Sequence, residues 1–234
     1  MEKIKILGIG IDNVTLEEAV EYSRKRISSG WITKVYTPNS EMLVETVRDR
    51  SFEELLMAGD LLLPDGVGLL KGARFYKKRF KEKVAGVDYA YALLKMAKEE
   101  GLKVFLLGGK EEVVELAAER VERDHPGVLA GFHDGYFGPE GEDLVIRKIK
   151  ASGADILLVA LGMKKQERFI GDHLERCGVK LGVGVGGTVD ILAGTVMRAP
   201  EFFIRNGLEW LYRLMKQPGR FIRMLDLPRF IFLC

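Results

Sequence analysis

The stretch KVFLLGGKEEVVELAAERVER, residues 103–123, contains the pattern that decides the fold. It opens with a short apolar run, Lys103–Leu107, of the kind that forms a buried β-strand. Two glycines follow, and Glu111–Arg123 then has apolar residues at three- and four-residue spacing, as on one face of a helix. A strand that leads into an amphipathic helix is part of a βαβ unit, so the stretch predicts a parallel sheet.

The same alternation continues on both sides of this stretch. Strands are expected at Lys3–Ile9, Lys34–Thr37, Asp60–Leu63, Lys103–Leu107, Asp155–Leu161 and Lys180–Val185. Helices are expected at Leu16–Ser28, Asp88–Glu100, Glu111–Arg123 and Lys165–Glu175. The sequence therefore predicts a Rossmann-like α/β fold, with a mostly parallel sheet and helices on both faces. Ligands bind beyond the carboxyl ends of the strands in such sheets, so motifs that follow strands matter most.

Bulk properties limit the classes of protein that the chain can belong to. Its 234 residues, 47% hydrophobic and 30% charged, fit one large α/β domain with a small appendage. The net charge of +2 does not indicate a nucleic-acid-binding protein. Cys177 and Cys234 offer no disulfide framework, as expected in a reducing cytosol. The N-terminal residues read as a strand, not a signal peptide, and no apolar run approaches the roughly 18–20 residues that span a bilayer, so we expect any membrane contact to be peripheral.

The last 39 residues differ in composition from the rest, so we expect a catalytic core at 1–195 and a helical, basic, aromatic appendage at 196–234. The appendage has seven basic and three acidic residues, and seven of the 21 aromatic residues. One helix is expected from Pro200 to Lys216, and then a shorter amphipathic segment with Phe221 on its apolar face, ended by Pro228. Glu201/Arg205 and Glu209/Arg213 have the spacing of helix-surface ion pairs. No such partner is evident for three further basic residues, which makes them candidates for binding phosphate: Lys216, Arg220 and Arg223.

Polar motifs follow the second and third predicted strands. Thr37 and Asn39 suit sugar hydroxyls, although Asn39 or Ser40 is equally suited to cap the next helix. Asp65 follows the apolar run that ends at Leu63 and precedes two glycines, which allow a ligand to approach closely. The alternative for Asp65 is a helix N-cap.

Three further motifs are candidates for ligand binding. Tyr136, in the turn 134–138, can stack on a flat base or pack under its loop. Gln166 belongs to a predicted helix N-terminus that suits an anionic or hydroxylated ligand. The glycine-rich stretch 182–190, which includes Gly187 and Asp190, can cradle phosphates or a nucleotide.

Other patterns are weaker or missing. Gly8-Ile9-Gly10-Ile11-Asp12 resembles a nucleotide-binding turn, but it lacks the third glycine of the dinucleotide fingerprint. The alternative is a tight strand-to-helix turn capped by Asp12 or Asn13. The chain has no P-loop, no metal-ligand spacing of histidines, no nucleophile motif and no Asp-x-Asp pair to hold a divalent cation on a nucleotide-sugar. If a diphosphate leaves from this protein, we expect arginines to neutralise it.

Nine blocks in order along nearly the whole chain resemble the WecG/TagA/CpsF family of bacterial glycosyltransferases, and most closely its TagA-type enzymes of wall teichoic acid synthesis. The blocks are TPNSEM (37–42), LLPDGVG (62–68), VAGVDY (84–89), FLLGG (105–109), GFHDGYF (131–137), LGMKKQERFI (161–170), GVGGTVDILAG (184–194), RAP (198–200) and GLEWLYRL (207–214). Three positions depart from the family pattern as we know it. Lys83 stands where an arginine is expected, Met163-Lys164 replaces a small residue and a proline, and Val189 replaces a phenylalanine.

The resemblance implies an inverting, metal-independent transferase of cell-surface polymer synthesis, without a cofactor. The donor would be UDP-N-acetylmannosamine, the acceptor undecaprenyl-diphosphate-linked N-acetylglucosamine, and the new linkage β-1,4. The enzyme would be cytoplasmic and peripheral on the inner face of the cell membrane, would bind no nucleic acid, and is a possible homo-oligomer. The donor's uronic acid form remains an alternative.

Site roles also follow from the resemblance. Asp65 would be the base, and Thr37, Asn39 and Gln166 would form the polar pocket. Nucleotide contacts would fall on Tyr136, Gly187 and Asp190, and diphosphate contacts on Arg213, Arg220 and Arg223. Two rival classes remain open: an oxidoreductase that uses a nucleotide cofactor through Gly8 and Gly10, and a non-catalytic module that binds a membrane through the appendage.

Overall fold

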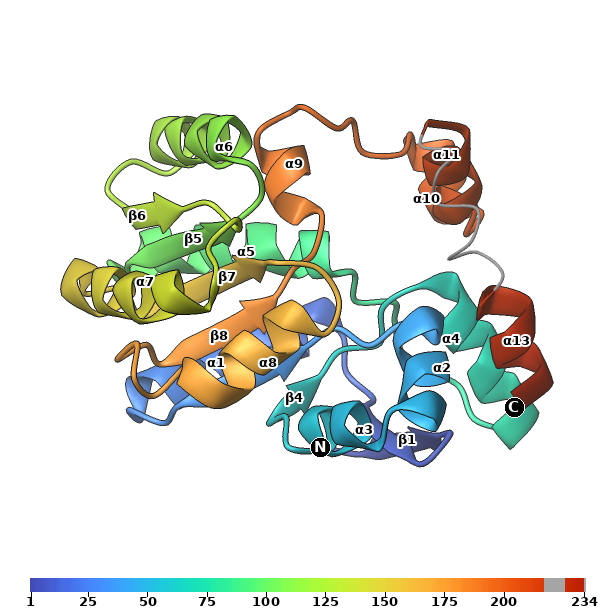
Figure 1. Cartoon of the computed structure of the whole chain (residues 1–234). Coiled ribbons are helices and arrows are strands. Elements are labelled where there is room, and N and C mark those ends of the chain that lie inside the picture. Colours follow the sequence, from blue (N-terminus) through green and yellow to red (C-terminus); the bar gives the residue numbers. More distant parts are fainter. Residues whose placement is uncertain (217–225, 234) are drawn as a thin grey trace.

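The computed structural model of the chain describes residues 1–216 and 226–233, and its centre is a six-stranded sheet (Figure 1). The strands lie in the order β4-β3-β8-β7-β5-β6, and every pair of neighbours is parallel. Their bounds are β3 Thr33–Tyr36, β4 Leu61–Leu62, β5 Val104–Gly108, β6 Leu129–His133, β7 Ile156–Ala160 and β8 Leu181–Gly184. The predicted Rossmann-like fold is therefore confirmed. The sequence did not indicate β6, whose Gly131 weakens the strand pattern.

Helices cover both faces of the sheet, because alternate side chains of each buried strand point to opposite faces. In β5, Val104 and Leu106 pack on one face, and Phe105 and Leu107 on the other. The first face is covered by α1 Leu16–Ser28, α5 Gly86–Glu100, α6 Glu111–Asp124 and α9 Thr188–Leu192. On the second face, the hydrophobic core includes residues from six helices: α2 Ser40–Arg48, α3 Arg50–Met57, α4 Val67–Gly72, the 3₁₀ helix η1 Ala73–Tyr76, α7 Pro139–Ser152 and α8 Lys165–His173.

The N-terminal segment is a β-hairpin, so the expected single strand Lys3–Ile9 with a nucleotide-binding turn is wrong. β1 Lys3–Ile6 pairs antiparallel with β2 Ile9–Asp12. Leu7 and Gly8 form the turn, both with positive φ (48° and 87°), as the tight turns of two-residue hairpins require. Asp12 is buried and accepts the amide proton of Leu62 at 2.9 Å, and Thr15 caps α1 instead of Asp12 or Asn13. The hairpin removes the Gly8–Gly10 nucleotide-binding turn on which the oxidoreductase alternative depended.

The C-terminal segment also differs from the expectation. In place of one helix from Pro200 to Lys216 there are two, α10 Glu201–Arg205 and α11 Glu209–Lys216. Gly207 separates them with φ +67°, a conformation that favours glycine and ends a helix. Pro228 lies within the first turn of α13 Asp226–Leu233, where the missing amide proton is not needed. Phe221, Arg220 and Arg223 lie outside the described residues.

Helix α13 returns to the core, because it packs against α2 and α4 (Figure 1). Phe230 is fully buried there, whereas Phe232 is 91% exposed. The division of the chain at residue 195 remains a prediction, but part of the appendage contributes a side chain to the core cluster.

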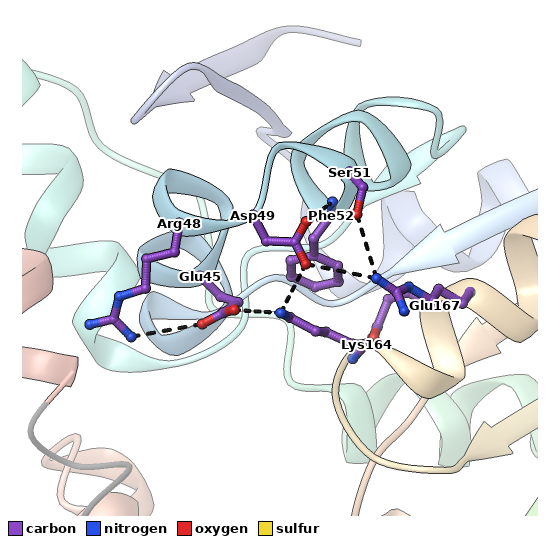
Figure 2. A network of polar contacts seen from close by, with 8 residues as sticks. Glu45, Arg48, Asp49, Ser51, Phe52, Lys164 and Glu167 are labelled. Atoms are coloured by element: carbon purple, nitrogen blue, oxygen red, sulfur yellow. Dashed lines mark hydrogen bonds and ion pairs between the residues drawn. The ribbon is translucent and has the colours of Figure 1, made fainter.

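A charged network fastens the loop after β7 to helices α2 and α3 (Figure 2). The ammonium of Lys164 pairs with Glu45, and with Asp49 at 2.9 Å. Arg48 pairs with Glu45 at 3.8 Å, and Arg168 with Asp49 at 3.7 Å. The Ser51 hydroxyl and the Lys164 ammonium hold the pKa of Asp49 below its usual range. Lys164 itself has φ +69°, so these contacts hold a backbone conformation that lysine rarely adopts.

Behind this network lies a buried carboxyl group, Glu167, at the start of α8. Its oxygens accept the Lys164 amide proton and a Gln166 amide proton, each at 2.7 Å. Burial raises the pKa of Glu167, because removal from water disfavours the charged form. A pKa that is higher in the folded state makes a stabilising contribution, which is fully present at a pH below the pKa of the unfolded chain. This contribution is lost as the pH rises through the pKa of the folded state.

The pH dependence of Glu167 can be isolated with Glu167→Gln. Relative to the native chain, this variant should gain free energy of unfolding as the pH rises above about 4.3, the ordinary glutamate value, because it carries no buried charge. Urea titrations of both proteins across this pH range measure the difference. A difference that stays constant with pH would contradict burial of an ionisable Glu167.

The docking of α13 can be tested with Phe230→Ala. The substitution should lower the free energy of unfolding by about 3 kcal/mol, because it empties a fully buried aromatic site. Phe232→Ala on the same helix is the matched control and should change it by less than about 0.5 kcal/mol. Equal effects of the two substitutions in denaturant titration would show that α13 does not dock through Phe230.

Candidate functional site

The motifs predicted to carry the chemistry gather at one edge of the sheet. Thr37 and Asn39 follow β3, Asp65 follows β4, and Gly187 and Asp190 follow β8. Gln166 and Tyr136 follow β7 and β6. Because all six strands are parallel, the loops that follow them meet at the carboxyl edge, where α/β proteins bind ligands.

A pocket of about 440 Å³ lies at this edge, between the core and the C-terminal helices. Four of the predicted site residues line it: Asn39, Asp65, Gly187 and Asp190. The opposite wall comes from the appendage and includes Met197, Arg198, Glu209, Trp210, Tyr212, Lys216 and Pro228. The pocket therefore needs both the α/β core and the C-terminal helices.

Asp65 is held at the start of α5. One of its carboxylate oxygens accepts the amide proton of Gly86, the first residue of that helix, at 3.3 Å. Ala85 at the N-cap supplies no side-chain acceptor, so Asp65 takes that place. The positive end of the helix dipole favours a carboxylate there. The alternative role of Asp65, as the N-cap of the helix that follows it, is wrong, since the N-cap of that helix, α4, is Gly66.

The residues after β3 have structural roles beside the pocket. Asn39 caps α2 by accepting the Met42 amide proton at 3.0 Å, and it lines the pocket as well. Thr37 is 7% exposed and donates its hydroxyl proton to the Gly184 carbonyl at 3.1 Å, which ties the end of β3 to the end of β8. Thr37 does not line the pocket in this structure, so its contact with substrate remains a prediction.

Gln166 supports the pocket from behind. It is 5% exposed, and its side-chain oxygen accepts the amide proton of Gly186 at 3.1 Å. Gly186 has φ +53°, and a Cβ built on it would meet nothing within 4 Å. The Gln166 amide thus shapes a glycine loop that leaves open space next to Gly187, the N-cap of α9. A direct catalytic contact by Gln166 remains a prediction.

Tyr136 lies at the other end of the edge and is 77% exposed, so it does not pack under its loop. Its amide donates to the Asp134 carboxylate at 2.7 Å, and the Gly135 amide donates to the Gly109 carbonyl at 2.9 Å. A Cβ on Gly109 would lie 3.3 Å from Val189 of α9. The Tyr136 loop is therefore coupled through Gly109 to the helix that carries Asp190.

Two cations in the pocket were not among the predicted site residues. Lys83 forms an ion pair with Glu209 of α11, with both side chains about four-fifths buried. Arg198 contacts both oxygens of Asp88, at 2.6 and 2.7 Å, and its Nε is buried without a partner in the described part of the chain. The motifs VAGVDY and RAP lie beside or include these two cations. Lys83 and Glu209 are 126 residues apart, and Arg198 and Asp88 are 110 apart, so no local spacing rule could have predicted either pair.

One of the two expected surface pairs is confirmed, and the other, Glu209 with Arg213, remains a prediction. Glu201 and Arg205 form theirs at 2.8 Å. Glu209 pairs with Lys83, which joins α11 to the segment that enters α5. Lys216 lies 6.0 Å from the centre of the Tyr212 ring and lines the pocket. The side chain of Arg213, like Arg220 and Arg223, is outside what the structure describes, so the phosphate roles of these arginines remain predictions.

Comparison with known proteins identifies the family. The model of the glycosyl transferase WecG/TagA/CpsF family matches residues 4–234. A Bacillus spizizenii protein named N-acetylglucosaminyldiphosphoundecaprenol N-acetyl-beta-D-mannosaminyltransferase is 38% identical over 198 residues, which cover 84% of this chain and 76% of the relative. A Bacillus subtilis protein with the same name is 32% identical over 232 residues, 98% of this chain and 90% of the relative. The chain therefore belongs to the WecG/TagA/CpsF family of glycosyltransferases.

Proposed function

We propose that the chain transfers N-acetylmannosamine from UDP-N-acetylmannosamine to N-acetylglucosamine on undecaprenyl diphosphate, with inversion and a β-1,4 linkage. The names of both relatives support the sugar and the acceptor. The observation that carries the chemistry is the Asp65 carboxylate, fixed at the start of α5 in the wall of the pocket.

Asp65 acts as the general base in this proposal. It takes the proton of the acceptor hydroxyl while that oxygen forms a bond to the anomeric carbon of the donor. The bond from that carbon to the UDP oxygen breaks at the same time, and UDP leaves. A carboxylate is a weak base for a resting hydroxyl, but it suffices when proton transfer accompanies bond formation, because the hydroxyl becomes acidic as it attacks. The hydrogen bond from Gly86 keeps the carboxylate oriented.

The donor nucleotide lies along the Gly187 and Asp190 side of the pocket in this proposal. Gly186 and Gly187 leave room for a close approach of the diphosphate, and Asp190 contacts the nucleoside. Tyr136, exposed at the neighbouring loop, stacks on the uracil. The acceptor sugar then occupies the side of Asn39 and Asp65.

The negative charge of the leaving diphosphate is met by cations of the chain. Lys83, Arg198 and Lys216 line the pocket, and Arg213, Arg220 and Arg223 are proposed to join them. Within the described ranges, no group of three or more His, Cys, Asp or Glu side chains is arranged to hold a metal. Metal independence is part of the proposal and is open to test with a chelator.

The uronic acid form of the donor is less favoured. The names of the relatives specify a mannosaminyl group.

The described helices include none that is long and apolar enough to cross a bilayer. The proposed location is peripheral on the cytoplasmic face of the cell membrane.

The role of the base is tested with Asp65→Asn. This variant should turn over about 10²–10⁴ times more slowly, because the amide cannot accept the proton. It should bind UDP as the native chain does, since Asp65 lies on the acceptor side. A radiometric transfer assay with a soluble short-lipid acceptor, together with calorimetric titration of UDP, gives both values.

Asp190→Ala is the matched counterpart on the donor side. It should weaken UDP binding in the same titration and leave the chemical step measurable at saturating donor. Near-native turnover by Asp65→Asn would reject Asp65 as the base, whereas loss of UDP binding in that variant would reject the division of the pocket into two sides.

A further inference from the structure

A strongly basic segment runs from α4 toward α5, and its basic residues do not line the pocket. Residues 66–81 contain six basic residues and no acidic one, although the whole chain has a net charge of only +2. Five of the six are exposed and form no ion pair with any side chain that the structure describes: Lys71, Arg74, Lys77, Lys78 and Arg79. We call these five residues, with the exposed Phe75 and Tyr76 among them, the basic surface.

The basic surface is built on a fixed frame. Ala73 and Phe80 are buried on either side of its exposed part. The Lys81 amide donates to Asn13 at 2.8 Å, and the Tyr76 hydroxyl accepts the Leu7 amide proton at 3.3 Å. The cations between these points project from a held backbone, so like charges are kept close together, with no ion-pair partner among the described side chains. Such an arrangement destabilises the chain slightly unless a partner of opposite charge covers it.

The position of the basic surface relates it to the pocket. Helix α4 starts at Val67, which lines the pocket, and its six residues rise about 8 Å to Gly72, next to Lys71. Helix α13 packs against α4 as well (Figure 1). It starts near Pro228, which lines the pocket, and it ends in exposed apolar side chains. Among these, Phe232 is 91% exposed. Two elements thus run from the rim of the pocket to exposed basic or apolar residues.

We propose that the basic surface binds anionic lipid head groups and, with the exposed end of α13, holds the pocket against the membrane. The proposal rests on the proposed function, in which the acceptor is attached to a lipid. Lysine and arginine near an anionic surface gain electrostatic energy, and aromatic side chains beside them enter the head-group boundary. A nucleic acid fits less well, since Phe75 and Phe232 would face a polar backbone.

The experiment is co-sedimentation of the full chain with vesicles of phosphatidylcholine, with and without phosphatidylglycerol. The native chain should bind the anionic vesicles more tightly, and salt should weaken this binding. The triple variant Lys77→Gln, Lys78→Gln and Arg79→Gln should bind them at least about tenfold more weakly, because each cation strengthens binding about fivefold.

The matched control removes three exposed cations from α7, which lies away from α4 (Figure 1): Arg147→Gln, Lys148→Gln and Lys150→Gln. This variant has the same net charge as the first and should bind vesicles as the native chain does. Native-like binding by the first variant, equal losses in both variants, or tighter binding of the native chain to duplex DNA than to anionic vesicles would each overturn the proposal.

The same variants separate this proposal from the proposed function. On a soluble short-lipid acceptor, the variant of the basic surface should transfer at the native rate, because its three side chains lie outside the pocket. A slower rate there would overturn the membrane role in favour of a catalytic one. Absence of transfer by the native chain would reject the proposed function and leave the vesicle result to be judged separately.

Discussion

The hydrogen bond from the Gly86 amide to Asp65 joins the end of β4 to the start of α5, and the pocket is arranged around this joint. The segment that enters α5 also carries Lys83, whose ion pair with Glu209 brings α11 over the site. Asp88, in the first turn of the same helix, holds Arg198 at the start of the C-terminal segment. One helix N-terminus therefore orients the proposed base and fastens the wall that faces it.

The far side of the pocket depends on a chain of polar contacts that runs from partly exposed side chains to buried ones. Lys164, held by Glu45 and Asp49, fixes the turn before α8 (Figure 2). That turn sets Glu167 and Gln166, and Gln166 holds the Gly186 amide. Since a buried donor or acceptor without a partner is costly, such a chain of contacts allows few alternative arrangements. The network therefore gives the glycine loop one shape before any ligand arrives.

Local patterns were sufficient to predict much of the fold and the position of the site. The alternation of residues 103–123 fixed the parallel sheet, and strand ends pointed to Asp65 and Asp190. Asn39 caps α2, as its sequence allowed, and it lines the pocket, but its contact with a sugar remains a prediction. The hairpin at Leu7-Gly8 was missed because a glycine after a strand suits several turns, and the break at Gly207 because spacing alone continued the helix.

Contacts between distant segments could not be predicted in the same way. Glu209 pairs with Lys83, which lies 126 residues away in the sequence, and no local spacing indicated that contact. The pair of Arg198 with Asp88 joins two family blocks whose separate spacing says nothing about their meeting. Gln166 shows the opposite case: its motif suggested a ligand contact, and the structure places the side chain behind the wall as a support for Gly186.

The central claim is a direct displacement at the anomeric carbon, with Asp65 as base and cations of the chain in place of a metal. The most direct measurement is the anomeric configuration of the product, by NMR, after incubation of the chain with UDP-N-acetylmannosamine and a soluble N-acetylglucosaminyl diphospholipid in the presence of EDTA. Direct displacement predicts a β-linked N-acetylmannosamine formed at an undiminished rate. An α-linked product, or transfer that stops with EDTA and returns with Mg²⁺ or Mn²⁺, would contradict it.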